Sequence, residues 1–329
     1  MRFFWVLLTG AALLGGAGLW WIHQPMPLAL AAGAGALDLE IEPGNANLAA
    51  AAVVASGVDV PVRALQLWFR VSGQARQIKA GSYEIAPGST PRSVLTMLVR
   101  GDQTLRSVTL VEGWTFAQVR AALQKAELLR QETPGLEPEI IMKMIDKPGI
   151  HPEGRFFPDT YTYAKGSSDL AVFKRAARAM DKRLDAAWAL RSPDSPLRTP
   201  DDALVLASIV EKETGQAADR AQISGVFTNR LRIGMMLQTD PSVIYGLGSR
   251  FDGNLRRRDL QADTPYNTYT RTGLPPTPIA MPGKAALLAA VQPAPTKALY
   301  FVARGDGSSH FSASLDEHNR AVNKFIRKQ

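Results

Sequence analysis

Cysteine is absent from the sequence, and histidine is scarce, with four residues in a chain of 329. Without cysteine the chain can form no disulfide, offers no thiolate nucleophile and has no cysteine-ligated metal site. No pair of the histidines has the spacing of a metal site. We therefore expect no metal ion and no other cofactor.

The rest of the composition is that of ordinary globular protein, with 46% hydrophobic and 21% charged residues. Because domains usually contain about 100–200 residues, the length allows a short anchor and about two domains. The formal net charge of +8 suits an anionic neighbour such as lipid headgroups, an acidic polymer or nucleic acid.

The N-terminus carries a long uncharged run, from Phe3 to Ile22, and with histidine counted as neutral no charge follows until Asp38. About 20 apolar residues suffice for a helix to cross a bilayer, and Trp20 and Trp21 stand where an interfacial aromatic belt would lie. A cleaved signal peptide is the alternative, but its apolar region is usually shorter, about 7–15 residues. We expect a transmembrane anchor at 1–24 and a linker at 25–36, with the remaining chain outside the cytoplasm. Nucleic acid is then not an expected partner.

Three segments repeat one pattern, a strand-like alternation, a tight turn with glycine and a helical pattern. They are residues 37–54, 81–98 and 107–123, and a further helix is expected at 60–71. Ser89 or Thr90, with Pro91, and Thr115 are candidate helix starts. Repeated units of this size indicate an α+β fold. Small βααβ modules of this kind often bind cell-wall glycan, although a purely structural role is equally compatible with the pattern.

The stretch from Glu153 to Tyr161, EGRFFPDTY, combines aromatic rings with carboxylates in a segment rich in proline and glycine. It is either a surface loop held by its aromatic residues or part of a cleft wall in which Glu153 binds substrate hydroxyls. An amphipathic helix is expected to follow at 169–190.

A pair of glutamates ends the apolar helix expected at 199–215, where the sequence reads SIVEKETG. At 3.6 residues per turn Glu213 continues an apolar stripe, whereas Glu211 points to nearly the opposite side. Partial burial and the negative end of the helix dipole would both raise the pKa of Glu213. A protonated carboxyl near neutral pH is what cleavage of a glycosidic bond requires. The alternative is a solvated last turn whose charges only exchange salt bridges.

Polar segments rich in proline follow this helix, at 236–242 and 264–283. So much proline indicates an ordered irregular wall, where binding groups tend to lie. Asp240, before Pro241, is either a helix N-cap or a second catalytic carboxylate. The chain ends with a strand at 298–304, a glycine turn, and a helix capped by Ser314 with Glu317.

Several of these stretches together resemble the membrane-anchored endolytic murein transglycosylases of the MltG (YceG-like) family. They are GRFFPDTY, SIVEKET, NRLRIGMMLQTDPSVIYGLG, PYNTYTRTGLPPTPIAMPG and YFVARGDGSSHF. The resemblance runs from the anchor to the C-terminus and is densest over residues 153–319. It implies a LysM-like subdomain, for which we take residues 37–104, and a catalytic domain at 105–329. The family's essential glutamate, the second Glu of E-K-E-T, falls on Glu213.

The resemblance further implies an enzyme of the cell inner membrane whose catalytic domain faces the periplasm. It would cleave the MurNAc–GlcNAc bond of nascent peptidoglycan glycan and leave a 1,6-anhydroMurNAc end, which would terminate strand elongation. Peptidoglycan synthases are candidate protein partners. The substrate-binding candidates are Gln238, Thr239, Asp240, Asn267, Thr268, Tyr269 and Glu153. Two alternatives stay open, a hydrolytic muramidase that uses Glu213 with Asp240, and a non-catalytic scaffold that binds glycan.

Overall fold

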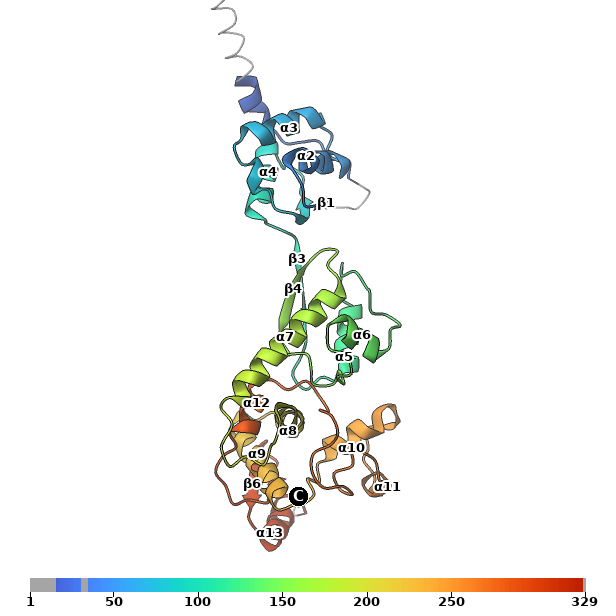
Figure 1. The fold of residues 1–329 in the computed structure, drawn as a ribbon, viewed down its shortest axis with the longest axis vertical. Helices are drawn as coiled ribbons and strands as arrows, with labels where there is room; N and C mark the ends of the chain where they lie inside the picture. Colours follow the sequence, from blue (N-terminus) through green and yellow to red (C-terminus); the bar gives the residue numbers. More distant parts are fainter. Residues whose placement is uncertain (1–15, 31–34, 328–329) are drawn as a thin grey trace, which may run out of the picture. The chain divides into compact units, whose positions relative to one another are not determined.

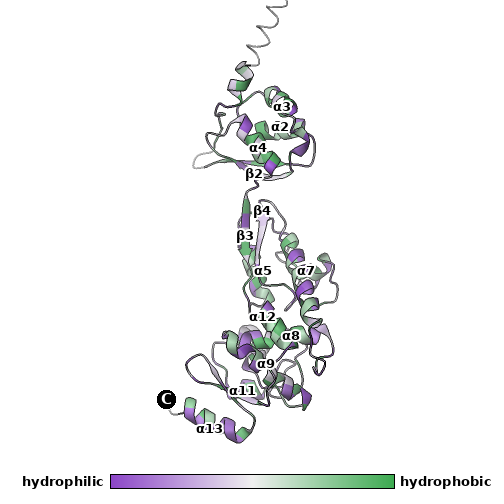
Figure 2. Ribbon diagram, turned by 90° about the vertical axis from the view of Figure 1, so that its left-hand side faces the viewer, coloured by the Kyte–Doolittle hydropathy of each residue, from purple (hydrophilic) through white to green (hydrophobic). Residues whose placement is uncertain are grey.

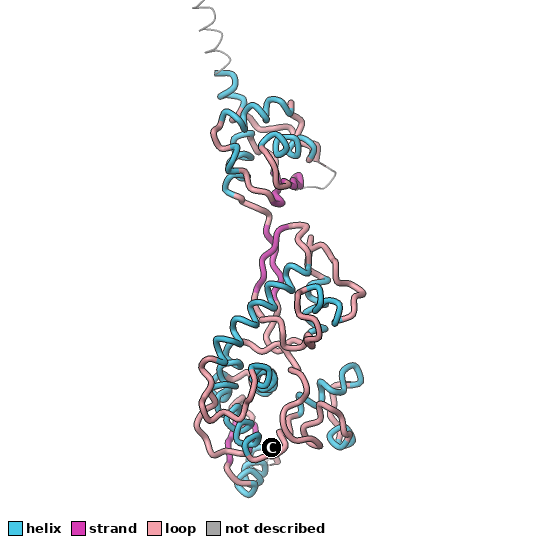
Figure 3. Tube along the Cα trace, viewed as in Figure 1, coloured by secondary structure: helices cyan, strands magenta, loops and turns pink. Residues whose placement is uncertain are grey.

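The structure, a computed structural model, describes residues 16–30 and 35–327 of the chain. It contains two compact units, of which the first comprises Met1–Arg106 and Thr162–Ser167 and the second Ser107–Tyr161 and Ser168–Gln329. Figure 1 shows the elements of each unit. Within the described residues the strands form short two-stranded sheets among many helices, so the predicted α+β class is confirmed (Figure 3).

Unit 1 has the order strand, helix, helix, strand, helix. Its elements are β1 (Leu37–Ile41), α2 (Ala46–Ala55), α3 (Val62–Val71), the short 3₁₀ helix η1 (Ala75–Gln77), β2 (Gly81–Ile85) and α4 (Pro91–Arg100). Strands β1 and β2 pair antiparallel, with Leu37 opposite Ile85 and Ile41 opposite Gly81. Because two helices connect the paired strands, unit 1 contains a βααβ module.

Local sequence signals account for these elements. The side chain of Asn45 accepts hydrogen bonds from two backbone N–H groups of the first turn of α2. Thr90 forms a capping box with Ser93 at the start of α4, and Pro91 occupies the first helical position, as predicted. Alternate residues of β1 are buried, and they pack with helix residues such as Phe69 around one hydrophobic core.

The segment expected to be a linker, 25–36, belongs to unit 1 wherever it is described. Met26 is 5% exposed, and its backbone N–H donates to the carbonyl of Ser89 over 2.8 Å. Leu28 forms an isolated β-bridge with Val58. Residues 25–30 are therefore packed chain, and residues 31–34 lie outside the described part.

Most of the expected anchor, residues 1–15 of 1–24, also lies outside the described part of the chain. A search of residues 16–30 and 35–327 finds no helix that combines the length and the apolar character needed to cross a membrane.

Strands β3 (Leu105–Thr109) and β4 (Thr160–Ala164) pair with each other, and the division between the two units falls within both strands. The boundary expected at 104/105 took no account of the returning segment 162–167. The surface loop considered for Glu153–Tyr161 ends before Tyr161, because β4 begins at Thr160, and Tyr161 and Tyr163 alternate there with exposed threonines. Proline and glycine upstream concealed this short alternation.

Unit 2 is mainly helical. Its elements besides β3 and β4 are α5 (Phe116–Gln124), α6 (Pro138–Met144), α7 (Asp169–Trp188), α8 (Pro200–Glu213), α9 (Ala217–Arg232), α10 (Asp240–Leu247), η2 (Gly248–Arg250), α11 (Arg257–Gln261), α12 (Lys284–Val291), β5 (Tyr300–Ala303), β6 (Ser309–Ser312) and α13 (Leu315–Phe325). Helix α8 packs against α7, α9, α10 and α12, and all of its residues from Ala203 to Val210 are buried. Figure 2 shows the hydrophobic residues of these helices. Helix α8 is therefore the centre of the unit.

The start of α8 matches the prediction, and its end does not. Thr199 and Asp202 form a capping box, with Pro200 in the first turn. The helix ends at Glu213 because Thr214 adopts extended backbone, with φ −147°. The stop expected at Gly215 is thus two residues late, and Glu213 is the last residue of the helix.

The Gly225→Ala variant tests the packing of α9. A Cβ at this position would lie 2.7 Å from Cγ2 of Thr296 and 2.8 Å from the carbonyl oxygen of Ala294. Alanine favours a helix over glycine by roughly 1 kcal/mol, but overpacking costs about 1–3 kcal/mol. We expect the upper end of this cost, since one contact is with backbone, and therefore a lower denaturation midpoint by circular dichroism.

Ser224→Ala is the matched control on the same helix. Ser224 is fully buried and its hydroxyl finds no hydrogen-bond partner among the residues that the structure describes, so its removal should leave the midpoint unchanged or raise it. A higher midpoint for Gly225→Ala would contradict the close approach of α9 to Ala294.

Candidate active site

Glu213 occupies the last position of α8, after a wholly buried stretch of helix. Its side chain is half-buried, and its Oε1 accepts a hydrogen bond from the hydroxyl of Thr239. Among residues 16–30 and 35–327, no protein group donates a hydrogen bond to the other oxygen, Oε2. One oxygen is thus held in place and the other is free to meet a ligand.

The surroundings of Glu213 favour its protonated form. Burial raises the pKa of this carboxyl, and the negative charge of Asp240 acts in the same direction. The hydrogen bond from Thr239 and the positive charge of Arg230 oppose this shift without cancelling it. The net effect is a carboxyl whose pKa lies above its ordinary value.

A group of buried hydroxyls holds Thr239 in position. The backbone N–H of Thr239 donates to Oγ1 of Thr268 over 3.0 Å, and its carbonyl accepts from Oγ of Ser242 over 2.9 Å. The hydroxyls of Ser242 and Thr268 are themselves 2.9 Å apart. Of the predicted substrate-binding residues, Thr239 thus contacts Glu213 and Thr268 supports Thr239. Because they are only 2% and 3% exposed, they position the Glu213 carboxyl and are closed to a ligand.

Asp240 is the first residue of α10 and not its N-cap. The N-cap is Thr239, which makes no side-chain cap bond, so the capping role considered for Asp240 is wrong. Its exposed carboxylate instead accepts a hydrogen bond of 2.6 Å from the hydroxyl of Tyr269. Burial, followed by this carboxylate, raises the pKa of the half-buried Tyr269. The two residues form a polar pair beside Glu213.

Gln238 and Asn267 flank the pair of Thr239 and Thr268 along the chain, but Gln238 is exposed and Asn267 is buried. Gln238 is exposed, has a left-handed backbone with φ +48°, and donates its N–H to the carbonyl of Thr268 over 3.0 Å. Such a conformation costs a non-glycine residue on the order of 1–3 kcal/mol and is common at ligand sites. Asn267 is 1% exposed, and its amide donates to three backbone carbonyls in the segment 259–262. Asn267 therefore orders the loop, and Gln238 remains open to a ligand.

Arg230 was missed from the sequence. It lies on α9, is 6% exposed, and donates from Nε to the carbonyl of Leu299 and from Nη1 to the carbonyl of Leu237, both over 2.7 Å. Arg230 lies on the same side of α9 as the buried Ile223 and Phe227. A charged residue at such a position is rarely buried without a partner, and this could have indicated a functional residue from the sequence. The buried guanidinium fixes the strand start at Leu299 and the approach to Gln238 while its charge acts on Glu213.

Glu153 is buried away from the contacts of Glu213. It is 3% exposed, its Oε1 accepts from the N–H of Phe116 over 2.9 Å, and its Oε2 accepts from the hydroxyl of Tyr245 over 3.1 Å. These bonds join the start of α5 to α10. Burial raises the pKa of Glu153 to about 7. With both oxygens bound inside the protein, Glu153 positions α10 rather than lining the site.

Glu211 and Lys212 bind two loops on the other side of α8. Oε2 of Glu211 accepts from the N–H of Gly283 over 2.8 Å, and Nζ of Lys212 donates to the carbonyl of Gly113 over 3.3 Å. The two glutamates therefore make contacts with different segments, as their helical positions predicted. The alternative of a solvated last turn is wrong for Glu211, which is half-buried and bound to backbone.

No group of histidine, aspartate and glutamate residues in the described ranges, 16–30 and 35–327, could hold a metal ion. The described neighbours of the Glu213 carboxyl are the hydroxyl of Thr239 and, beside it, the pair of Asp240 and Tyr269.

Comparison with known proteins identifies the family. The family model described as the YceG-like family matches residues 39–324. The endolytic murein transglycosylase of Bacillus subtilis (strain 168) is 32% identical over 293 residues, which cover 80% of this chain and 77% of that protein. The chain therefore belongs to the YceG-like family.

Two further proteins are similar to it. The endolytic murein transglycosylase of Streptococcus pneumoniae (strain D39) is 26% identical over 286 residues, 77% of this chain but 51% of that protein, so the chain spans about half its length. A crystal structure of a YceG-like protein from Listeria monocytogenes has 27% identity and a TM-score of 0.54, and the match covers 87% of this chain and 98% of that one.

The Glu153→Gln variant should flatten the pH dependence of stability. The pKa of Glu153 is raised from 4.5 to about 7 in the folded protein. Between these two pH values the folded state therefore keeps a proton on Glu153 that the unfolded state has lost. The stability of the wild type therefore falls as the pH rises through about 7, by at most about 3 kcal/mol. Glutamine stays neutral, so chemical denaturation at pH 5 and pH 8 should give more similar free energies of unfolding.

Glu137→Gln is the control, since Glu137 is exposed and its side chain makes no cap bond. It should keep the wild-type pH dependence. An unchanged slope in Glu153→Gln would mean that Glu153 is ionised in the folded protein throughout this range.

Proposed function

We propose that the protein is an endolytic murein transglycosylase in which Glu213 is both the acid and the base. Its relatives in Bacillus subtilis and Streptococcus pneumoniae carry this name, and the chain is a lyase of the same class. The observation that carries the assignment of Glu213 is its carboxyl, whose Oε1 is held by Thr239 and whose Oε2 accepts no hydrogen bond from the described residues. The substrate is the glycan strand of peptidoglycan.

A single carboxyl suffices for this reaction. The protonated carboxyl of Glu213 first gives its proton to the glycosidic oxygen as the bond from C1 of MurNAc breaks. The resulting carboxylate then takes the proton of the C6 hydroxyl of the same sugar, whose oxygen forms the new bond to C1. Because this attack is intramolecular, no water has to be bound and activated by a second carboxylate.

The electrostatics of the site suit both steps. Burial raises the pKa of Glu213 and so favours the protonated form that cleavage requires. After proton transfer, the hydroxyl of Thr239 and the charge of Arg230 stabilise the carboxylate. Opposing influences of this kind allow one group to serve as acid and then as base.

We assign glycan contacts to the exposed members of the site. Gln238 and Asp240 are exposed and Tyr269 is half-buried, so each can meet sugar hydroxyls. Asp240 is then a substrate contact rather than a catalytic base, because its carboxylate already accepts the hydrogen bond of Tyr269. The hydrolytic muramidase and the non-catalytic scaffold are not favoured by the named relatives.

The proposal includes a LysM-like subdomain in unit 1 and a membrane anchor at the N-terminus. The antiparallel βααβ module of unit 1 supports a LysM-like subdomain. The uncharged run from Phe3 to Ile22 supports a single-pass anchor in the cell inner membrane, with the catalytic domain in the periplasm. Nascent peptidoglycan and its synthases are the partners that this placement would bring close.

Glu213→Gln should abolish cleavage while the fold is retained, because it preserves the acceptor for Thr239 and removes the transferable proton. General acid–base catalysis is typically worth about 10²–10⁴-fold, and the loss should reach the upper end because one group serves both steps. Release of soluble fragments from purified peptidoglycan measures the effect.

Glu211→Gln is the matched control, since it removes the same charge from the same helical turn. Its amide oxygen can still accept from Gly283, so turnover should stay near normal. If Glu211→Gln were inactive and Glu213→Gln active, the assignment would be wrong.

Asp240→Asn separates the lyase from a paired-carboxylate hydrolase. Products should keep anhydro ends, each lighter by one water than a muramidase product, in mass spectrometry. The negative charge of Asp240 raises the pKa of Glu213, so its removal should shift the pH–rate profile to lower pH. Reducing-end products, lost altogether in Asp240→Asn, would instead establish hydrolysis by the Glu213–Asp240 pair.

A further inference from the structure

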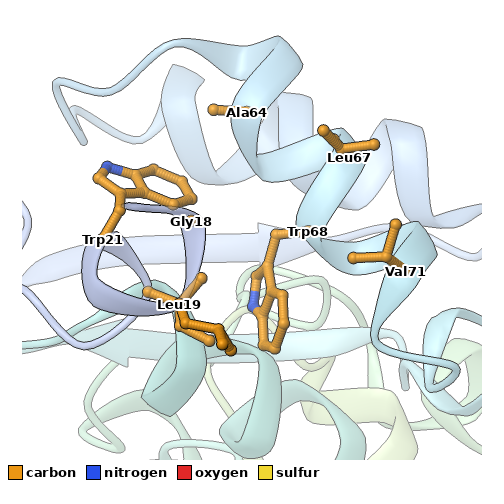
Figure 4. A pocket seen from close by; sticks show the side chains of 8 residues that line it. Gly18, Leu19, Trp21, Ala64, Leu67, Trp68 and Val71 are labelled. Carbon is orange, nitrogen blue, oxygen red and sulfur yellow. The ribbon is translucent and has the colours of Figure 1, made fainter. Parts of the chain in front are cut away.

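Unit 1 has an apolar groove at its N-terminal end, with a volume of ≈ 370 Å³ (Figure 4). Leu19 and Trp21 line it from one side, and Leu67, Trp68 and Val71 of α3 line it from the other. Leu19, Leu67 and Val71 are 64%, 61% and 66% exposed. An apolar surface of this kind on a folded domain marks a binding face.

Helix α3 is apolar on two sides. Leu65 and Phe69 are fully buried in the core of unit 1, which explains one side. Leu67 and Val71, four residues apart, form a second apolar stripe that unit 1 leaves exposed. Large apolar side chains that stay this exposed side by side on a folded unit indicate an interaction surface. The second stripe therefore points to a partner outside unit 1.

We propose that this face, formed by Leu19, Leu67 and Val71, rests in the headgroup region of a lipid bilayer. The inference depends on the proposed anchor. Residues 16–21 are helical and reach the groove, and they continue a sequence that carries no charge from Phe3 onward. The face is thus adjacent to the point at which the chain would leave the hydrocarbon.

The polar residues of α3 fit a bilayer surface. Arg63 and Arg70 are exposed, and the helix has no acidic residue. Arg63, Leu67, Arg70 and Val71 follow the spacing i, i+4, i+7, i+8, which places them on one side of the helix. Arginine can extend its charge to lipid phosphates while its stem lies along the apolar surface.

The connection between the helical residues 16–21 and the rest of unit 1 is short and held by hydrogen bonds. The carbonyl of Ile22 accepts from the N–H of Arg92 over 3.2 Å, and Met26 donates to the carbonyl of Ser89 over 2.8 Å. Ile22 itself is 4% exposed. A chain that leaves the membrane at Trp20 and Trp21 is thus bound to α4 within a few residues, which keeps α3 beside the bilayer.

The absence of cysteine allows a direct test on the full chain. Leu67→Cys, Val71→Cys and Glu40→Cys would each carry one nitroxide spin label in vesicles of phosphatidylethanolamine and phosphatidylglycerol. Glu40 is the control, because it is exposed on β1, on the side opposite to the buried Leu39. Frequent collisions of the label with oxygen indicate that the labelled side chain lies in lipid. Frequent collisions with a water-soluble nickel chelate indicate that it is exposed to water.

We expect the ratio of oxygen to nickel collisions to be several-fold higher at positions 67 and 71 than at position 40. Equal, water-like ratios at all three positions in vesicle-bound protein would overturn the inference and leave the anchor intact. Spin–spin broadening at position 71 would show that a second copy covers the face, which also overturns it. Protein recovered free of vesicles would refute the anchor and with it the inference, while the assignment of Glu213 would be unaffected.

Discussion

The hydrogen bond from Thr239 to Glu213 is the interaction on which the rest of the catalytic unit depends. It joins the end of α8 to the turn before α10, two segments that neither helix alone would bring together. Helix α8 can hold Glu213 because its preceding residues are buried among four other helices. The turn can hold Thr239 because its backbone is bound by the hydroxyls of Ser242 and Thr268. The carboxyl that we propose as the catalytic acid is therefore oriented by the core itself.

Prediction from the sequence succeeded where the signals are local. The cap at Thr199, the helical position that separates Glu213 from Glu211, and the strand and glycine turn before the capping box of Ser314 each depend on residues within a few positions of one another. It failed for the partner of Asp240 and for Arg230, because these contacts join segments distant along the chain. The strand at β4 was missed because its alternation is shorter than the irregular sequence around it.

Two buried carboxyls show how the same physical effect serves two purposes in this unit. Burial raises the pKa of both Glu213 and Glu153. Glu153 has both oxygens bound by Phe116 and Tyr245, so its proton stabilises the packing of α10. Glu213 has one oxygen without a protein donor in the described chain, so its proton can be given away. The number of bound oxygens thus separates Glu153, which is held inside the protein, from Glu213, which we propose as the reactive carboxyl.

Three consecutive residues at the end of α8 have three separate partners: Glu211 holds Gly283, Lys212 holds Gly113, and Glu213 meets Thr239. Each added residue turns a helix by about 100°. A single insertion or deletion between Thr199 and Glu211 would therefore rotate all three side chains by about 100°, away from their present partners. Exchange of an apolar residue in this helix leaves these three partners in place, whereas a change in its length does not. Alignments of the family should consequently show substitutions in this helix and no gaps.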